Sequence, residues 1–397
     1  MGDIDAIIDL VAQLVRMPTR AGVDDCAPVI GVTERWLRER RVTSRVLRVG
    51  RQPVALVVVV AGRADAAAQA PVYMLNATLD TAGFGDESRW RDLPTSACVR
   101  DGWMYGRGSA DSKVGAAIFC QLVAHFVAAR RALRGTLVLL LDLDEHSGGF
   151  AGVRRYFEQH AGLPRPDGVF IGYPGNDHLV VGSRGFTRAC IEVRGEAAHS
   201  GGSRRRGINA VIRAAQLIVE LDAAHLAHAE AALQSATFPL PPQLTVTAVD
   251  GGEGYSSVPD LCRVLVDIRL TPRFTRSAAM RALRALVQRF DRESAACPVT
   301  RIEWQRGWPA YRISDAHPMV RALRRAAERE FQRVVTPAVV GPSNIGNHLK
   351  TLKIPTLAGF GVTYRGVHAQ DECIELASIA PVYRSYLAAL TDLLCAG

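Results

Sequence analysis

The chain has 397 residues, of which 48% are hydrophobic and 22% charged, so it has the composition of a folded globular protein and not of a disordered one. This length exceeds what one hydrophobic core usually organises, which predicts two domains. No apolar run reaches the roughly 18 residues that a membrane span requires. The amino terminus, MGDIDAIIDL, lacks the basic stretch of a secretory signal. We therefore expect no membrane partner.

Charge and cysteine content point to a cytoplasmic protein that does not bind nucleic acid. The net charge is +9, but the one dense basic cluster, Arg204–Arg206, has no interleaved aromatic residues, and no zinc-finger or RNA-binding signature is present. A solvated arginine loop, or one that attracts small anions, is the simpler interpretation. The eight cysteines show no paired short spacing such as CxxC, which favours a reduced, cytoplasmic location.

The first third of the chain predicts alternating helices and strands. Amphipathic patterns predict helices, and continuous apolar runs predict strands that are buried on both faces. In chain order these are helices at 3–16 and 28–40, strands at Val54–Val60 and Val72–Leu75, a helix at 114–130 and a strand at 136–141. Runs of this kind are typical of a mixed or parallel sheet that is covered by helices on both faces.

From about residue 184 the pattern changes to half-exposed strands. Phe186–Val193 and Leu261–Leu270 alternate between apolar and polar residues, and helices are predicted near 207–222 and 275–290. After about residue 297 the first pattern returns and ends in a helix at 377–394. We therefore predict an α/β protein in two parts. A mixed-sheet domain with helices on both faces comprises residues 1–183 and 296–397, and a smaller inserted α+β domain comprises residues 184–295.

Four apolar strands of the larger domain end in polar or ionisable residues. They are 72–75 before Thr78 and Asp80, 136–141 before Asp142, Asp144, Glu145 and His146, 168–171 before Tyr173, and 355–360 before a glycine-rich turn and His368. Ligands bind beyond the carboxyl ends of strands in open α/β sheets. Buried strands seldom end in acids and histidines unless something pairs with them. Ordinary turns and helix caps could explain any one strand, but the four together predict a functional site.

Several motifs follow one another in a recognisable order. They are Asp101–Lys113 (DGWMYGRGSADSK), Asp144–His146 (DEH), Gly195–Ser200 (GEAAHS), Val258–Asp260 (VPD), Asp267–Arg269 (DIR) and His368–Glu372 (HAQDE). In this order and spacing they resemble the zinc aminoacylase and carboxypeptidase family that includes acetylornithine deacetylase and succinyl-diaminopimelate desuccinylase. The resemblance spans nearly the whole chain and implies a catalytic domain with an inserted lid and dimerisation domain.

The resemblance also implies five metal-ligand positions, here Thr78, Asp111, His146, Tyr173 and His368. The family has a histidine at the first and acids at the third and fourth, and holds two metals bridged at the Asp111 position. Threonine and neutral tyrosine are poor ligands, so we expect the first metal to be lost. Asp111, His146 and His368 form a complete set for the second, with histidine in place of glutamate. The expected cofactor is one divalent transition metal per subunit, most readily manganese or zinc.

Catalytic roles follow from the same resemblance. Glu145 stands at the general-base position, where a carboxylate next to a divalent ion can deprotonate water and then protonate the leaving nitrogen. Asp80 orients the first ligand in the family. Because Thr78 is no ligand, Asp80 could instead hold Lys113, water or substrate. Three roles are open to Tyr173, namely a phenolate ligand, a hydrogen-bond donor to substrate, and filler where the other metal was.

Substrate contacts are expected from residues outside the ligand set. His199 of the inserted domain would stabilise the oxyanion in the partner subunit of a homodimer or higher homo-oligomer, with a surface turn histidine as the alternative. Arg269 would bind a substrate carboxylate or pair with Asp267. Ser256 and Asn344 stand where relatives have other polar residues, which indicates altered contacts with substrate.

The expected function is hydrolysis of a C–N bond in a small carboxylate-bearing substrate. Amide hydrolysis of an N-acyl amino acid or dipeptide is one reaction. Release of ammonia from an aromatic amino acid, as in aminohydrolases of the 5-nitroanthranilate type, is the other, because the rebuilt metal site suggests atypical chemistry. A catalytically inactive homologue that binds a small molecule without metal is the alternative from another class.

Overall fold

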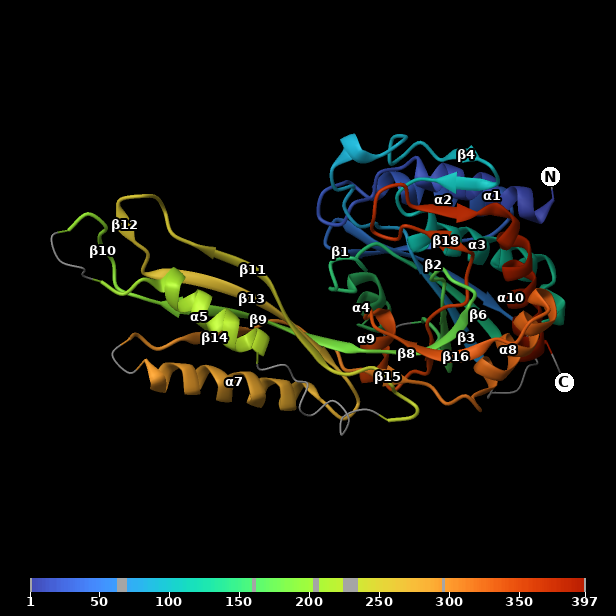
Figure 1. The fold of residues 1–397 in the computed structure, drawn as a ribbon. Coiled ribbons are helices and arrows are strands. Elements are labelled where there is room, and N and C mark those ends of the chain that lie inside the picture. Colours follow the sequence, from blue (N-terminus) through green and yellow to red (C-terminus); the bar gives the residue numbers. More distant parts are fainter. Residues whose placement is uncertain are drawn as a thin grey trace. The chain divides into compact units, whose positions relative to one another are not determined.

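The computed structural model describes residues 2–62, 70–158, 162–202, 207–223, 235–294 and 297–395 (Figure 1). The cluster Arg204–Arg206 lies outside these ranges. The chain forms two compact units, the first from residues 1–182, 313–338 and 344–397 and the second from residues 183–312 and 339–343. In the part of the chain that is described, no helix is long and apolar enough to cross a membrane.

The first unit is built on a six-stranded mixed sheet. Its order is β1 (Arg45–Val49), β2 (Gln52–Ala61), β6 (Thr136–Asp142), β3 (Val72–Thr78), β7 (Gly168–Ile171) and β17 (Thr356–Leu357). Strands β6, β3, β7 and β17 run parallel, whereas β1 and β2 are antiparallel to their neighbours. A smaller sheet has the order β18 (Tyr364–Arg365), β19 (Cys373–Glu375), β5 (Trp103–Tyr105) and β4 (Cys98–Arg100).

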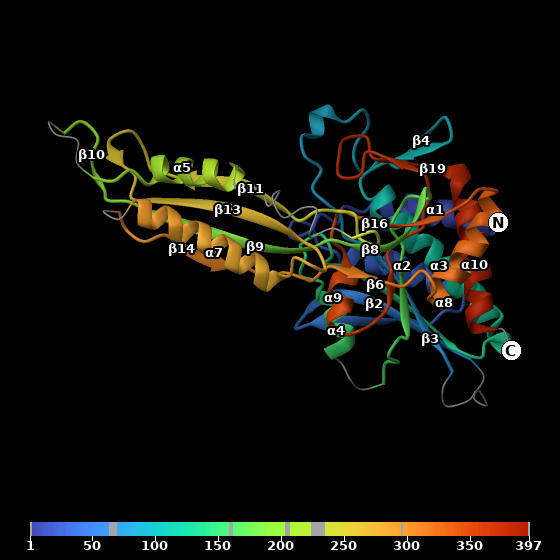
Figure 2. The same ribbon diagram turned by 60° about the horizontal axis from the view of Figure 1, so that its bottom comes forward.

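Helices cover both faces of the large sheet, as the sequence predicts (Figure 2). They are α1 (Asp3–Val15), α2 (Ala27–Glu39), α3 (Val114–Ala128), α4 (Ala151–Glu158), α8 (Pro318–Phe331), α9 (Ile345–Thr351) and α10 (Ile379–Leu394). Alternate residues of β6 such as Leu139 join the core formed with α1 and α3, while Leu140 points to the other face and is equally buried. On that other face Gly152 of α4 lies so close to Ala55 of β2 that a side chain would not fit.

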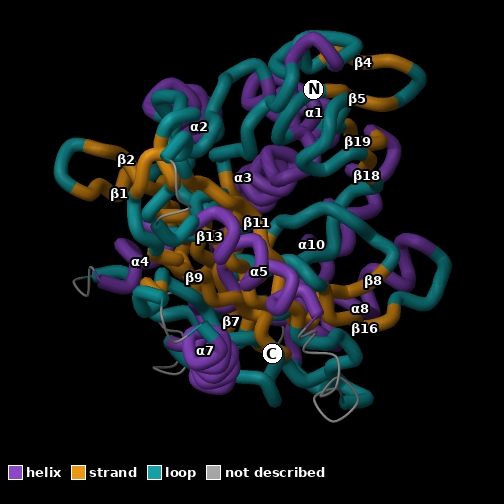
Figure 3. Tube along the Cα trace, turned by 60° about the vertical axis from the view of Figure 1, so that its left-hand side comes forward, coloured by secondary structure: helices purple, strands orange, loops and turns teal. Residues whose placement is uncertain are grey.

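The second unit has a four-stranded antiparallel sheet with two helices packed on one face (Figures 1 and 3). Its order is β11 (Gln243–Gly251), β13 (Leu261–Leu270), β9 (Gly185–Arg194) and β14 (Arg301–Trp304), and the helices are α5 (Ala210–Ala223) and α7 (Arg276–Glu293). Leu217 of α5 and Leu283 of α7 join the inward residues of β9 and β13 in one core. A two-stranded ribbon, β10 (Ala198–His199) with β12 (Ser257–Val258), completes the unit.

Two predicted boundaries differ from the structure. The second unit continues to Arg312 and not to residue 295, because β14 pairs with β9. The strand predicted at 355–360 is confined to Thr356–Leu357. Gly361 lies against the backbone of Tyr173, in a close approach that excludes a side chain. The chain passes between the units near the strands β8 (His178–Ser183), β15 (Tyr311–Arg312) and β16 (Thr336–Val340).

The register of the parallel strands positions the predicted site. Thr78 at the end of β3 lies opposite Asp142 at the end of β6, and Asn76 of β3 lies opposite Ile171 at the end of β7. The carboxyl ends of these three strands therefore meet at one edge of the sheet, and the polar residues that follow them are brought together there.

Candidate metal centre

Three potential metal ligands converge beyond this edge of the sheet. One ligand atom from each of Asp111, His146 and His368 lies within 4.8 Å of the others. Nε2 of His368 is 3.1 Å and Nε2 of His146 is 3.6 Å from the same Oδ2 of Asp111. In the described ranges, Oδ1 of Asp111 and Nε2 of His146 are buried and have no hydrogen-bond partner. Two imidazoles and a carboxylate with buried, unsatisfied ligand atoms fit a divalent transition metal.

A buried ion pair holds two of the ligand-bearing segments together. Glu372, fully buried, accepts hydrogen bonds from the backbone N–H groups of Ala110 (3.0 Å) and Asp111 (3.2 Å) and pairs with Arg107 at 2.7 Å. Arg107 also donates to the carbonyl of Ala369, next to the second histidine ligand. Neither residue is predicted from the sequence to have a role, although both belong to the motifs Asp101–Lys113 and His368–Glu372.

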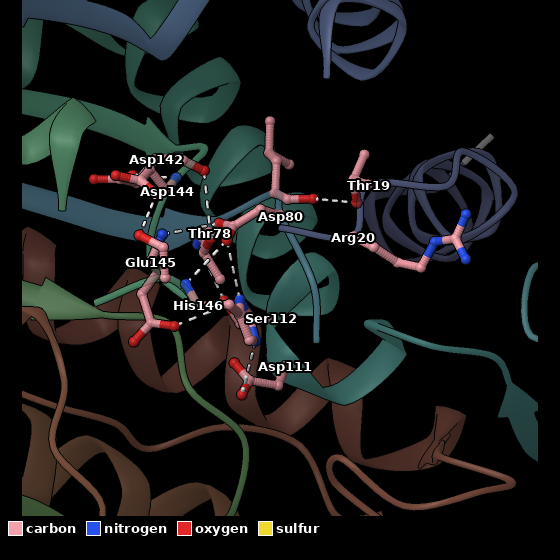
Figure 4. A network of polar contacts seen from close by, with 12 residues as sticks. Thr19, Arg20, Thr78, Asp80, Asp111, Ser112, Asp142, Asp144, Glu145 and His146 are labelled. Atoms are coloured by element: carbon pink, nitrogen blue, oxygen red, sulfur yellow. Dashed lines mark hydrogen bonds and ion pairs between the residues drawn. The ribbon is translucent and has the colours of Figure 1, made fainter. Parts of the chain in front are cut away.

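Asp80 contacts His146 (Figure 4). Of the partners that the sequence left open for it, namely Lys113, water and substrate, Lys113 is bound elsewhere. Its Oδ2 accepts from the backbone N–H of His146 at 3.0 Å and lies 3.2 Å from Nδ1 of the same residue. Its Oδ1 accepts from the N–H of Glu145 at 3.1 Å and from the hydroxyl of Thr78. Lys113 instead donates from Nζ to the carbonyl of Met17 at 2.8 Å, and burial lowers the pKa of this lysine to about 7.

Tyr173 donates a hydrogen bond to the predicted base. Its hydroxyl lies 2.6 Å from Oε1 of Glu145, while Oε2 of Glu145 is 3.5 Å from Nδ1 of His146. This pairing is not predicted from the sequence, because the two residues follow different strands and no local pattern indicates it. Tyr173 and Thr78, which stand at the positions of the lost ligands, therefore both donate to carboxylates of the site.

Neighbouring charges shift the pKa values of the site in the absence of metal. Burial would lower the pKa of His146, but the carboxylates of Asp111 and Asp80, which lie next to its two ring nitrogens, and the charge of Glu145 raise it to about 11. Burial and the charge of Asp111 raise the pKa of Glu145 to about 8, against the opposing charge of His146 and the hydrogen bond from Tyr173. Burial opposes the ionisation of Asp111, yet the neighbouring imidazoles of His146 and His368 hold its pKa well below the ordinary value. The metal-free site therefore keeps His146 protonated at neutral pH.

His199 and Ser256 lie in the second unit, His199 in β10 of the short ribbon and Ser256 directly before β12. Both residues are exposed, and the backbone of Ser256 accepts a hydrogen bond from the N–H of Ser200 at 3.0 Å. Nδ1 of His199 accepts from the N–H of Gly201 at 3.0 Å. The neutral form of this histidine therefore carries its proton on Nε2 and can donate from that exposed side.

Arg269 of the second unit lines an arginine-rich pocket. The pocket has a volume of about 580 Å³, and its lining includes Arg184, Arg188 and Asp267. Nε of Arg269 pairs with Asp267 at 2.7 Å, and Arg188 approaches the same carboxylate at 3.2 Å. The ion pair considered from the sequence is thus present. Two guanidinium groups share one carboxylate, while a third, that of Arg184, lines the same pocket.

Asn344, in the first unit, is buried at the start of α9. Its Oδ1 accepts from the N–H of Gly346 at 2.9 Å, and its own N–H donates to Oδ1 of Asn347 at 2.7 Å. This reciprocal arrangement satisfies backbone donors at the helix N-terminus. A contact between Asn344 and substrate stays a prediction.

The first unit holds an Asp–His–His cluster next to a glutamate, and the second is a smaller α+β unit. These features identify the class of the protein as a metal-dependent hydrolase of C–N bonds. The family described as Peptidase family M20/M25/M40 matches residues 74–392, and the chain belongs to this family. This finding confirms the resemblance seen in the sequence motifs.

Curated relatives and solved structures agree with this assignment. Succinyl-diaminopimelate desuccinylase 2 of Shewanella loihica is 27% identical over 319 residues, which cover 77% of this chain and 81% of the relative. A succinyl-diaminopimelate desuccinylase of Xanthomonas oryzae pv. oryzae is 31% identical over 61% of this chain, and the match spans less than two thirds (63%) of that relative.

Two solved structures show the same fold at low sequence identity. An M20 family metallo-carboxypeptidase from Sulfolobus solfataricus has a TM-score of 0.78 at 16% identity and covers 98% of this chain and 99% of its own. A dinuclear metal binding peptidase of the M20 family from Bacillus subtilis has a TM-score of 0.70 at 16% identity, with coverage of 99% and 98%.

Proposed function

We propose that the protein hydrolyses the amide bond of a small N-acyl amino acid or dipeptide with one divalent ion, manganese or zinc, per subunit. The observation that carries this proposal is the convergence of Asp111, His146 and His368 within 4.8 Å, directly beside Glu145. A divalent ion bound there would polarise the scissile carbonyl and lower the pKa of water. The names of the curated relatives, which are desuccinylases, favour an acylated amino acid as substrate.

The protein's own residues would divide the proton transfers and the binding between them. Glu145 takes a proton from the attacking water and returns it to the leaving nitrogen. Tyr173 occupies Oε1 of Glu145 by its hydrogen bond, which leaves Oε2 to exchange the proton. In the second unit, the surplus of positive charge around Arg269 suits a substrate carboxylate, and Ser256 and Asn344 are the further candidates for substrate contacts.

A second candidate reaction is the release of ammonia from an aromatic amino acid of the 5-nitroanthranilate type. The observation that favours it is the pair of residues at the lost ligand positions. Thr78 and Tyr173 donate to Asp80 and Glu145, so both are engaged with carboxylates. Attack on an electron-poor ring delocalises negative charge into the ring, and this reaction has less need of a second cation.

A product screen separates these reactions. The full chain, loaded with Mn²⁺ or Zn²⁺, would be incubated with N-succinyl and N-acetyl amino acids, dipeptides and aminobenzoates. We expect release of a carboxylate or amino acid from an acylamino acid or dipeptide, whereas ammonia from an aminobenzoate would establish the second reaction. The Glu145→Gln variant, purified in parallel, measures contaminating activity. No turnover across the panel would contradict both candidates.

We expect one tightly held divalent ion per subunit in the active enzyme, because Thr78 and Tyr173 offer no strong ligand for a second. Elemental analysis of the chain after metal loading and gel filtration measures this ratio, and activity is followed as metal is added back. Two tightly held ions that are both needed for activity would contradict the expectation. A chain that binds none would support the inactive binding homologue.

We also propose that the protein is a homodimer built on the second unit, in which His199 serves the partner's site. The edge strand β11 and the exposed apolar residues Val211, Ile212 and Val219 of α5 support this assembly. Mixing His199→Ala with Glu145→Gln chains would then restore activity, because one site of each mixed dimer has both residues. Random exchange limits the recovery to about a quarter of wild-type activity.

The control for this mixing experiment is each variant exchanged with itself, which should stay inactive. Subunit exchange is checked by following differently tagged chains. If chains exchange and no activity returns, His199 acts within its own chain or not at all. The cytoplasmic location likewise stays a prediction, supported by eight free thiols.

A further inference from the structure

We infer that Asp80 is a positioning residue for His146, which it holds with the proton on Nδ1 so that Nε2 faces the metal. This inference rests on the proposed metal site and adds a residue to it. The observation behind it is the contact of 3.2 Å between Oδ2 of Asp80 and Nδ1 of His146.

All the hydrogen-bond acceptor sites of the Asp80 carboxylate are occupied. Its buried carboxylate has four donors around it, two on each oxygen (Figure 4). Oδ1 accepts from the Thr78 hydroxyl and the Glu145 N–H, and Oδ2 accepts from the N–H of His146 and faces its Nδ1. An ionised carboxylate has about four acceptor sites and no proton to donate. Nδ1 of His146 must therefore be the donor in this contact.

In the neutral form of His146, which a divalent ion requires, the other nitrogen then has a free lone pair. Nε2 is buried, has no hydrogen-bond partner among the described residues and lies 3.6 Å from Oδ2 of Asp111. A carboxylate that binds the distal nitrogen of a ligating histidine fixes both the tautomer and the orientation of the ring. Oε2 of Glu145 is 3.5 Å from Nδ1, farther than Oδ2 of Asp80 at 3.2 Å, so Asp80 is the closer partner.

Asparagine cannot replace Asp80 in this arrangement. Its side chain has the same shape but only one acceptor oxygen, and its NH₂ group would face two donors. The chain offers a matched control in Asp142, which is equally buried at the end of β6. Its carboxylate accepts from the N–H groups of Asp144 and Val153 and, within the described part of the chain, contacts none of the three potential metal ligands.

The test measures the affinity of the full chain for Zn²⁺ by competition with a chromophoric chelator. Asp80→Asn should weaken binding by about 10–100-fold, as is typical when the partner of a ligating histidine is lost. Asp142→Asn should change the affinity by less than about threefold. Thr78→Val removes one of the four donors to Asp80. Its metal content at saturation should be unchanged, and its affinity for Zn²⁺ should lie between those of Asp80→Asn and Asp142→Asn.

A second measurement uses the wild type, so it does not depend on whether Asp80→Asn folds. In the Zn²⁺-loaded wild type with ¹⁵N-labelled histidine, the signal of His146, identified by its loss in His146→Gln, should show a proton on Nδ1 and zinc on Nε2. Zinc on Nδ1 would overturn the inference. So would an Asp80→Asn variant that binds as tightly as the wild type while His146→Ala does not bind. If the wild-type chain has no zinc site that depends on His146, the proposed metal site is overturned as well.

Discussion

Replacing Glu145 with glutamine is expected to lower kcat by about 10²–10⁴-fold or more, because the substitution keeps the size of the side chain but removes its ability to accept a proton. The amide oxygen can still accept the hydrogen bond that Tyr173 donates to Oε1 in the wild type. Glu145 is outside the group of three potential ligands, so the metal content should be unchanged. Steady-state kinetics together with elemental analysis of the same preparation measure both quantities.

Retained turnover in Glu145→Gln would require another base. From the sequence, Asp80 is the first alternative. The structure makes Asp80 a poor one, because four donors already occupy its carboxylate and it is fully buried. Turnover in that variant would therefore contradict the assignment of Glu145 without favouring Asp80.

His146→Ala and His368→Ala are each expected to abolish tight metal binding, because two ligands from this set leave a divalent ion largely hydrated. Metal titrations of the two variants measure this loss, and Thr78→Ala serves as the control that should keep its metal. Binding as tight as in the wild type in either histidine variant would place the ion elsewhere.

The wild-type affinity should also depend strongly on pH. The pKa of His146 is raised to about 11 in the metal-free site, so below that pH a proton occupies the histidine and the metal must displace it. Affinity should therefore rise by about tenfold per pH unit between pH 6 and 9. Ionisation of Glu145, with a pKa of about 8, acts in the same direction. An affinity that levels off above pH 7, as for an ordinary histidine with a pKa near 6.5, would contradict this electrostatic picture.

The elements and the ligand set could be predicted from the sequence where the pattern is regular. The alternation of Leu261–Leu270 is sustained over ten residues, and the strand begins and ends at these residues. Asp111, His146 and His368 are grouped by the resemblance of their motifs to the family, and the strand ends before His146 and His368 independently favour one edge of the sheet; the structure brings the three together. β14, with only four residues, is too short to show its period, which explains the misplaced boundary.

The side-chain partners within the site could not be predicted. The hydrogen bond between Tyr173 and Glu145 depends on the pairing of β3 with both β6 and β7, and a register shift of one residue would separate them. The contact of Asp80 with His146 has the same origin, since it joins residues that follow β3 and β6. Sequence motifs name such residues but do not say which of them touch.

The ion pair of Glu372 and Arg107 has a consequence for how the site takes up its metal. Asp111 and His368 are 257 positions apart in the chain. Even so, Glu372 accepts a hydrogen bond from the backbone of Asp111, and Arg107 donates one to the backbone of Ala369, the neighbour of His368. Half of the side chain of His368 is exposed, so packing alone would leave it considerable freedom. Because the backbone on both sides is already fixed, binding an ion restricts few additional torsion angles and the loss of conformational entropy is small. The ligand set is preorganised before the metal arrives.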